Sequence, residues 1–254
     1  MEKLLFLSFA VSLAGAGATA SFRTASALQT GSATQSSASA KQAVPSSEEP
    51  HHHRIVDNLR VAAYEVEVPA HEATLLHRHD KDYVYVVLGD ADITNAVVGK
   101  PEVKAHLADT AVNFVEGPIA HVATDVGDTP FRNITIELKR KQGGVKIFYP
   151  SVNAALAETS KPANADGSRD ILETDEMRVS AIKVAAGQIW IPAKSNYPRL
   201  FVRIDEMKNL AGQREPKATM FPEGMLVWVP GERKWSYPNY GKEDVKLVWL
   251  DFKN

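Results

Sequence analysis

Short alternating segments set the strongest limit on how this chain can fold. Between residues 61 and 68, Tyr64, Val66 and Val68 alternate with two glutamates, and this period of two indicates a strand with one buried face. Further strands are expected at 74–79, 83–88, 91–98, 110–115, 121–125 and 131–138. Many short strands separated by turn signals, with no long helical period, predict an antiparallel sandwich or barrel.

The second half of the sequence repeats the pattern of the first half. The expected correspondences are 179–187 with 61–71, 199–204 with the strand from Tyr83, 224–235 with the run ending in His121, and 245–252 with 131–138. The chain is therefore predicted to contain two similar β domains in tandem.

Three histidines of the first half are candidate metal ligands. His77 and His79 are one residue apart, and alternate residues of an extended chain point to the same face. His121 follows a Gly-Pro turn and begins a later strand. Neutral imidazole is the commonest metal ligand in proteins. We therefore predict that His77, His79 and His121 converge on one metal ion.

This arrangement resembles the cupin superfamily over residues 54–150. The first cupin motif reads G-x5-H-x-H-x3,4-E-x6-G and the second reads G-x5-P-x-G-x2-H-x3-N. His77 and His79 match the histidines of the first motif, and His121 matches that of the second. Tyr83 stands where the metal-binding glutamate of the family is expected, and Asp125 stands at the asparagine position.

The sequence departs from the two motifs at two further places. Gly89 comes one residue early, and Glu116-Gly117-Pro118 replaces P-x-G. The resemblance implies an all-β fold of two tandem cupin jelly-roll barrels (a bicupin), in which the second unit closes a sheet edge or forms a pseudo-dimeric interface. It also allows a homodimer through the cupin sheets.

The second barrel is expected to lack the metal site. In the register of the repeat, His77 becomes Ala193, His79 becomes Ser195 and His121 becomes Trp235. Tyr83 becomes Arg199. Trp235 is therefore predicted to fill the volume that a metal ion and its substrate would occupy, and the chain is expected to bind about one metal ion.

The expected domain boundaries follow the composition of the chain. They are a signal peptide at 1–20, a disordered Ser/Ala-rich linker at 21–53, a metal-binding cupin domain at 54–150, a linker at 151–170 with one helical turn near 152–157, and a degenerate cupin domain at 171–254. Lys3, an apolar run and Ala18-Thr19-Ala20 are typical of a secretory signal. His51-His52-His53 is interpreted as a solvated tract, and His71 and His106 as surface residues.

Composition narrows the partners and the chemistry. The chain has no cysteine, which excludes disulfides and thiolate chemistry. A net charge of −2 and a pI near 6.5 give no field suited to nucleic acid or to an anionic membrane. We expect a periplasmic or secreted protein with a small-molecule substrate or ligand, no nucleic-acid partner and no membrane association after signal cleavage.

Two functional hypotheses remain open. Three-histidine cupin sites without the glutamate resemble those of thiol dioxygenases and some ring-cleaving dioxygenases, which favours a metal-dependent dioxygenase ahead of a hydrolase or isomerase. Fe(II) is the favoured ion, with Zn, Mn or Ni as alternatives, and Tyr83 is the candidate catalytic hydrogen-bond donor. The alternative is a non-catalytic module that binds a metabolite or sugar, with a structural metal or none.

Overall fold

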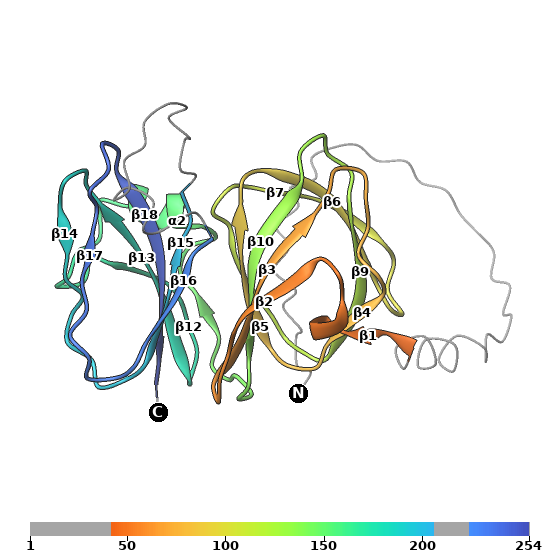
Figure 1. Cartoon of the computed structure of the whole chain (residues 1–254), viewed down its shortest axis with the longest axis horizontal. Helices are drawn as coiled ribbons and strands as arrows, with labels where there is room; N and C mark the ends of the chain where they lie inside the picture. Colours follow the sequence, from red (N-terminus) through yellow and green to blue (C-terminus); the bar gives the residue numbers. More distant parts are fainter. Residues whose placement is uncertain (1–41, 206–223, 254) are drawn as a thin grey trace, which may run out of the picture.

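The computed structural model describes residues 42–205 and 224–253, and almost all of its regular structure is β-strand (Figure 1). The strands form two barrels that lie side by side in Figure 1, which confirms the predicted all-β fold with two tandem barrels. The predicted signal peptide and most of the predicted linker after it lie outside the described residues.

Barrel 1 consists of two five-stranded sheets, β2-β3-β10-β5-β8 and β1-β4-β9-β6-β7. Its strands are β1 (Val44–Pro45), β2 (His52–Asp57), β3 (Val61–Val68), β4 (His77–His79), β5 (Tyr83–Leu88), β6 (Ala91–Val97), β7 (Val103–Leu107), β8 (Val112–Val115), β9 (Ile119–Asp125) and β10 (Phe131–Leu138). A short 3-10 helix, η1 (Ser46–Glu48), connects β1 to β2. Every neighbouring pair is antiparallel except β1 and β4, which are parallel.

Barrel 2 consists of the sheet β11-β12-β13-β18-β15-β16 and the pair β14-β17. Its elements are β11 (Lys146–Ile147), α2 (Val152–Ala157), β12 (Arg169–Glu173), β13 (Met177–Val184), β14 (Ile189–Trp190), β15 (Arg199–Arg203), β16 (Leu226–Val229), β17 (Tyr237–Pro238) and β18 (Val245–Phe252). Helix α2 lies at the helical turn expected in the predicted linker. The Ser151 side chain caps its start by accepting a hydrogen bond from the backbone nitrogen of Ala154. Among the described residues, no helix is both long enough and apolar enough to cross a membrane.

The predicted repeat is present in one sheet of each barrel, where the strands follow the same order. The order β2-β3-β10-β5-β8 corresponds to β12-β13-β18-β15-β16. The central ladder of each sheet ends in an equivalent pair, Val61 with Leu138 in barrel 1 and Met177 with Phe252 in barrel 2. Because the two ladders superpose in this register, each inward position of barrel 1 has a defined counterpart in barrel 2.

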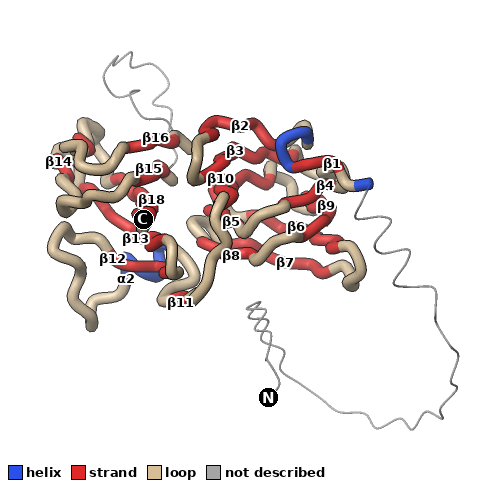
Figure 2. The backbone as a smooth tube through the Cα atoms, turned by 90° about the horizontal axis from the view of Figure 1, so that it is seen from below, coloured by secondary structure: helices blue, strands red, loops and turns tan. Residues whose placement is uncertain are grey.

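The two barrels share one apolar core. The repeated sheets face each other, and their facing side chains form a single buried cluster; its largest members include Ile134, Ile136, Leu138, Ile171, Leu172, Met177, Leu200 and Leu250. Figure 2 shows β5 and β10 on the side of barrel 1 that faces barrel 2. Each repeated sheet is therefore buried on both faces, since its other face fills the interior of its own barrel.

The ordered structure begins before the predicted boundary. Residues 44–53, assigned to a disordered linker from their composition, form β1, η1 and the start of β2. Val44 pairs with His77, and His52 pairs with Val66. These contacts are distant in sequence, so composition and local pattern do not reveal them. His106 lies within β7 rather than in a connection, although it is exposed as expected.

Candidate metal centre

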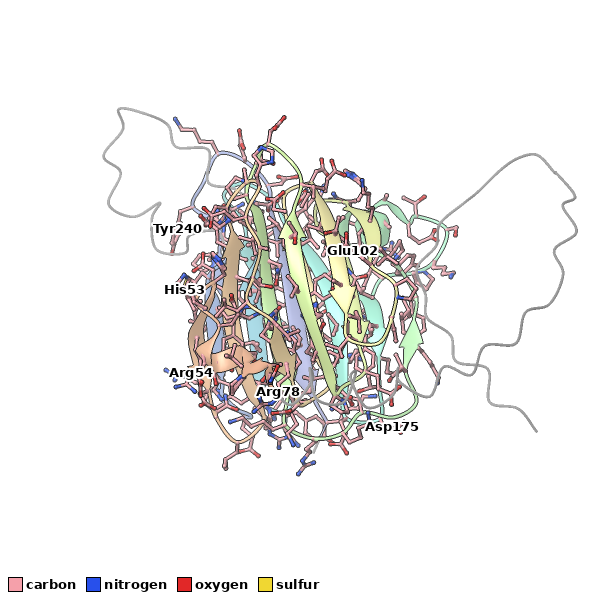
Figure 3. All side chains as sticks on the ribbon, turned by 90° about the vertical axis from the view of Figure 1, so that its right-hand side faces the viewer. His53, Arg54, Arg78, Glu102, Asp175 and Tyr240 are labelled. Carbon is pink, nitrogen blue, oxygen red and sulfur yellow. The ribbon has the colours of Figure 1, made fainter. Side chains whose placement is uncertain are left out.

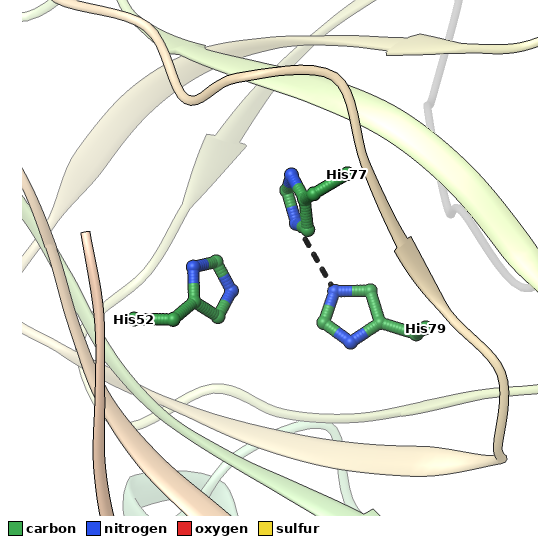
Figure 4. A group of neighbouring side chains, drawn as sticks. All are labelled: His52, His77 and His79. Atoms are coloured by element: carbon green, nitrogen blue, oxygen red, sulfur yellow. Dashed lines mark hydrogen bonds between the residues drawn. The ribbon is translucent and has the colours of Figure 1, made fainter. Parts of the chain in front are cut away.

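Three imidazoles meet inside barrel 1. His52 comes from β2, whereas His77 and His79 come from β4. One ring nitrogen of each lies within 4.8 Å of the others (Figure 4). The Nε2 atoms of His77 and His79 are 3.2 Å apart, close to the roughly 3–3.5 Å separation expected for two nitrogens bound to one ion at about 2.0–2.1 Å.

His121 borders this group from β9. It pairs with His77 in the β4–β9 ladder, and its ring centroid lies 4.5 Å from that of His77 and 5.4 Å from that of His79. Its Nδ1 donates to Asn95 Oδ1 at 2.8 Å, while its Nε2 is buried and has no hydrogen-bond partner. A buried nitrogen without a partner is costly. A bound metal ion would give this nitrogen a partner.

All four imidazoles are oriented in the same way. The Nδ1 of each ring donates to an oxygen, and the acceptors are Glu49 Oε2 for His52 (2.6 Å), the Leu75 carbonyl for His77 (2.9 Å), Glu137 Oε1 for His79 (2.9 Å) and Asn95 Oδ1 for His121. A proton fixed on Nδ1 leaves the lone pair on Nε2, which is the arrangement of metal-binding histidines in proteins.

Two buried carboxylates brace the histidines. Glu137 on β10 also accepts from Ser46 Oγ at 2.6 Å, and Glu49 also accepts from the backbone nitrogen of Leu75 at 3.1 Å. Burial raises the pKa of both carboxyls. The hydrogen bonds that each carboxylate accepts and the neighbouring histidines lower the pKa by more than burial raises it. The pKa of each carboxyl therefore lies below its ordinary value. Both groups are therefore ionised at neutral pH.

Three of the imidazoles, those of His52, His77 and His121, are held in the neutral form that binds metals. Burial lowers the pKa of His77 to about 4, and the charges of His52 and His79 act in the same direction. Burial also lowers the pKa of His52, and it lowers that of His121 well below its ordinary value. The residues present thus fit a divalent ion that prefers nitrogen ligands.

Tyr83 lies beside the histidines, on the face expected from strand alternation. Its ring stacks on His79 with centroids 4.3 Å apart, and it is 5% exposed. Burial raises the pKa of its hydroxyl above the ordinary value, so the group stays protonated and can donate a hydrogen bond. Tyr83 pairs with Glu137 in the β5–β10 ladder. A carboxylate that contacts a histidine thus comes from β10, at the position paired with Tyr83, whereas the motif places a glutamate at position 83 itself.

No known protein family and no curated protein matches this sequence. Solved structures do match. The salicylate 1,2-dioxygenase of Pseudaminobacter salicylatoxidans aligns with a TM-score of 0.53 and 14% identity over 79% of this chain and 75% of that one. AerE of Microcystis aeruginosa aligns with a TM-score of 0.52 and 10% identity over 81% and 99%.

An oxalate decarboxylase aligns with a TM-score of 0.50 and 9% identity over 76% of this chain and 68% of that one. Each of the three alignments covers more than three quarters of this chain. The chain has a two-barrel cupin fold.

The N-terminal ligand candidate was not predicted from the sequence. His51-His52-His53 was interpreted as a solvated tract, and for His52 this is wrong, since it is 9% exposed and faces His77. His53 is exposed and lies at the periphery in Figure 3. The available signal was that Ile55-Val56 follows the tract, because a β-branched pair indicates a strand in which only alternate histidines point inward.

The second barrel contains no histidine. The bridges Ala73–Thr124 and Ile189–Pro238 are equivalent, and counting along the strands from them places Ala193 at the position of His77 and Trp235 at that of His121. Trp235 packs against Phe201 with ring centroids 4.7 Å apart.

Charged residues of barrel 2 replace the pair beside the histidines. Arg199 pairs with Asp251 in the β15–β18 ladder as Tyr83 pairs with Glu137 in barrel 1. Arg199 Nε donates to Asp251 Oδ1, and the guanidinium lies 4.5 Å from the centroid of the Trp249 ring. An ion pair and aromatic rings thus occupy this end of barrel 2.

Proposed function

We propose that this cupin is a metal-dependent enzyme acting on a small molecule, with dioxygenase-type chemistry, and that His52, His77, His79 and His121 hold its metal ion in barrel 1. The observation that carries the proposal is the common orientation of the four rings, with every Nδ1 bound to an oxygen and the buried Nε2 of His121 left without a partner. Such outer hydrogen bonds are typical of metal-binding histidines.

With four imidazole ligands, the enzyme proposal requires an ion that binds more than four ligands. Four imidazoles on a six-coordinate ion leave two positions open, whereas four ligands complete the tetrahedral shell that Zn²⁺ prefers. Fe(II) is the favoured ion because it accepts imidazole ligands, and when bound it would supply O₂ chemistry at open positions. The fold shared with a dioxygenase supports this choice.

The residues of the chain have distinct roles in this proposal. Glu49 and Glu137 fix the rings of His52 and His79 and offset the charge of the ion. Burial of His77 and His79, at 1% and 2% exposure, excludes bulk water. Tyr83, which stacks on His79, donates a hydrogen bond to the substrate. The N-terminal sequence further supports a periplasmic or secreted location.

A binding module with a structural metal is the second candidate. It is favoured by the same four imidazoles, because a tetrahedral Zn²⁺ bound by all four would have no open position for substrate. The two candidates thus differ in the identity of the metal and in the consumption of O₂.

The test is elemental analysis of the purified full chain, followed by oxygen-uptake measurements with phenolic and thiol compounds. The enzyme proposal expects one redox-active ion per chain and oxygen uptake with at least one compound. His121→Ala should lose metal and oxygen uptake together, since the other ligands no longer fix the geometry. His106→Ala is the control, because His106 is exposed on β7 and its ring bonds to Asp92, away from the four histidine ligands.

Tyr83→Phe separates the role of the hydroxyl from that of the ligands. It should leave metal content unchanged and lower turnover by about 10²–10⁴-fold if the hydroxyl transfers a proton in the slow step. Stoichiometric zinc without oxygen uptake from any compound would favour the binding module, and an absence of metal from the wild-type chain would contradict both candidates.

A further inference from the structure

Three polar side chains form a row inside barrel 1. Asn113 on β8 and Thr135 on β10 pair with Tyr85, which lies between them on β5. We call Asn113, Tyr85 and Thr135 the polar row. Tyr85 is two residues from Tyr83, about 6.6–6.8 Å along the strand, and their ring centroids are 6.2 Å apart. Since Tyr83 stacks on His79, the polar row is separated from the histidines by the one inward residue Tyr83 along β5.

The row contains an unused hydrogen-bond donor. The Nδ2 atom of Asn113 is buried and has no partner. Thr135 is satisfied, because its Oγ1 donates to Asn133 Oδ1 at 2.8 Å. Burial raises the pKa of Tyr85 to about 12, so its hydroxyl is protonated at neutral pH and can donate. A buried amide that lacks a partner is destabilising, and a bound acceptor would give it that partner.

Barrel 2 shows that the fold does not require this row. The equivalent ladder positions hold Val227, Phe201 and Trp249, which pair with one another in the same order. All three are apolar and pack in the core of barrel 2. The polar row is therefore a property of the barrel that contains the histidines, and the equivalent sheet of barrel 2 forms without it.

The surroundings of the row carry little charge. The residues that surround the row on its own sheet are the inward positions of β3, β10, β5 and β8. None of these is Lys or Arg, and Glu137 is the only charged residue among them. A carboxylate ligand would thus find no cationic side chain on these four strands and would approach an ionised glutamate.

We infer that the polar row selects the substrate, and that the substrate is a small uncharged molecule with a hydrogen-bond acceptor for the Asn113 amide and the Tyr85 hydroxyl. The inference rests on the proposed function, since the row is placed next to the proposed metal ligands. It assigns the recognition of the substrate to β5 and β8, and the binding of the metal to β2, β4 and β9.

The test uses calorimetric titration of the purified full chain with its metal. The probes are three matched pairs of an amide and its carboxylate: acetamide and acetate, benzamide and benzoate, salicylamide and salicylate. We expect at least one amide to bind about tenfold more tightly than its carboxylate. Asn113→Val, which introduces the residue of barrel 2, should weaken that amide by about tenfold or more and leave the metal content unchanged.

Tyr85→Phe is the second variant, and it keeps the ring that packs beside Tyr83. It should weaken the same amide by severalfold. The inference is overturned if no amide binds, if each carboxylate binds as tightly as its amide, or if both variants bind like the wild type. Titration of metal-free protein separates the two proposals, because the amide preference should persist there even if the metal-dependent function fails.

Discussion

At the scale of single residues, the candidate site is determined by what the histidines contact behind them. Each ring has its own acceptor, and two of the four acceptors are the carboxylates of Glu49 and Glu137. Two ionised carboxylates balance the charge of one divalent ion, so the site would be close to neutral when occupied. This lowers the cost of burying the charged ion inside the barrel.

Glu137→Gln should weaken metal binding by about 10–100-fold. The amide oxygen can still accept from His79, but the negative charge is lost. The affinity is measured by competition with a chromogenic chelator. Asp251→Asn, at the equivalent position of barrel 2, is the control. It breaks a buried ion pair with Arg199, which should lower the stability by about 3–5 kcal/mol without changing the metal affinity. Equal metal affinities for wild type and Glu137→Gln would contradict a bracing role.

At the scale of elements, equivalent turns of the two barrels have the same close contact. A Cβ at Gly117, between β8 and β9, would lie 2.3 Å from the carbonyl oxygen of Lys81. A Cβ at Gly231 in barrel 2 would lie 2.2 Å from that of Asn196. In barrel 1 this contact holds the start of β9 against the turn between β4 and β5, and thereby sets the position of His121 beside His77.

Gly117→Ala and Gly231→Ala should each lower the free energy of unfolding by about 1–3 kcal/mol, because the backbone must move to admit the methyl group. Urea denaturation measures this loss. Only Gly117→Ala should also weaken metal binding, since it displaces the turn before His121. A metal affinity that falls equally in both variants would mean that the turn in barrel 1 has no specific effect on the site.

The element scale also explains what sequence could predict. Strands such as Val61–Val68 and Phe131–Leu138 were found because alternation is a local signal. The same alternation predicts that His77 and His79 point to one face, and their Nε2 atoms lie 3.2 Å apart. His52 was missed because its burial depends on pairing with β3 and on the parallel contact of β1 with β4, which join residues distant in sequence. Glu137 was missed because one glutamate within an apolar strand has no distinctive pattern.

At the scale of the whole molecule, one sheet is repeated in the two barrels, but only barrel 1 contains histidines. The shared core between the barrels covers the outer face of both repeated sheets, so barrel 2 protects the strands that carry Tyr83, Tyr85 and Glu137 from solvent. In barrel 2, aromatic residues fill the interior, and Trp235 stands at the position of His121. The repeat in the sequence predicted this division, since the candidate ligands disappear from one register to the other.

The central claim is that one metal ion binds in barrel 1 and that His52 is among its ligands. The most direct test is the metal content per chain of wild type, His52→Ala and His53→Ala after equal exposure to a weak chelator. His52 and His53 are neighbours in the sequence. His52 is buried beside His77 and His79, whereas His53 is exposed. The account predicts about one ion per chain in wild type and His53→Ala, and a large loss in His52→Ala. Equal metal content in all three proteins would contradict it.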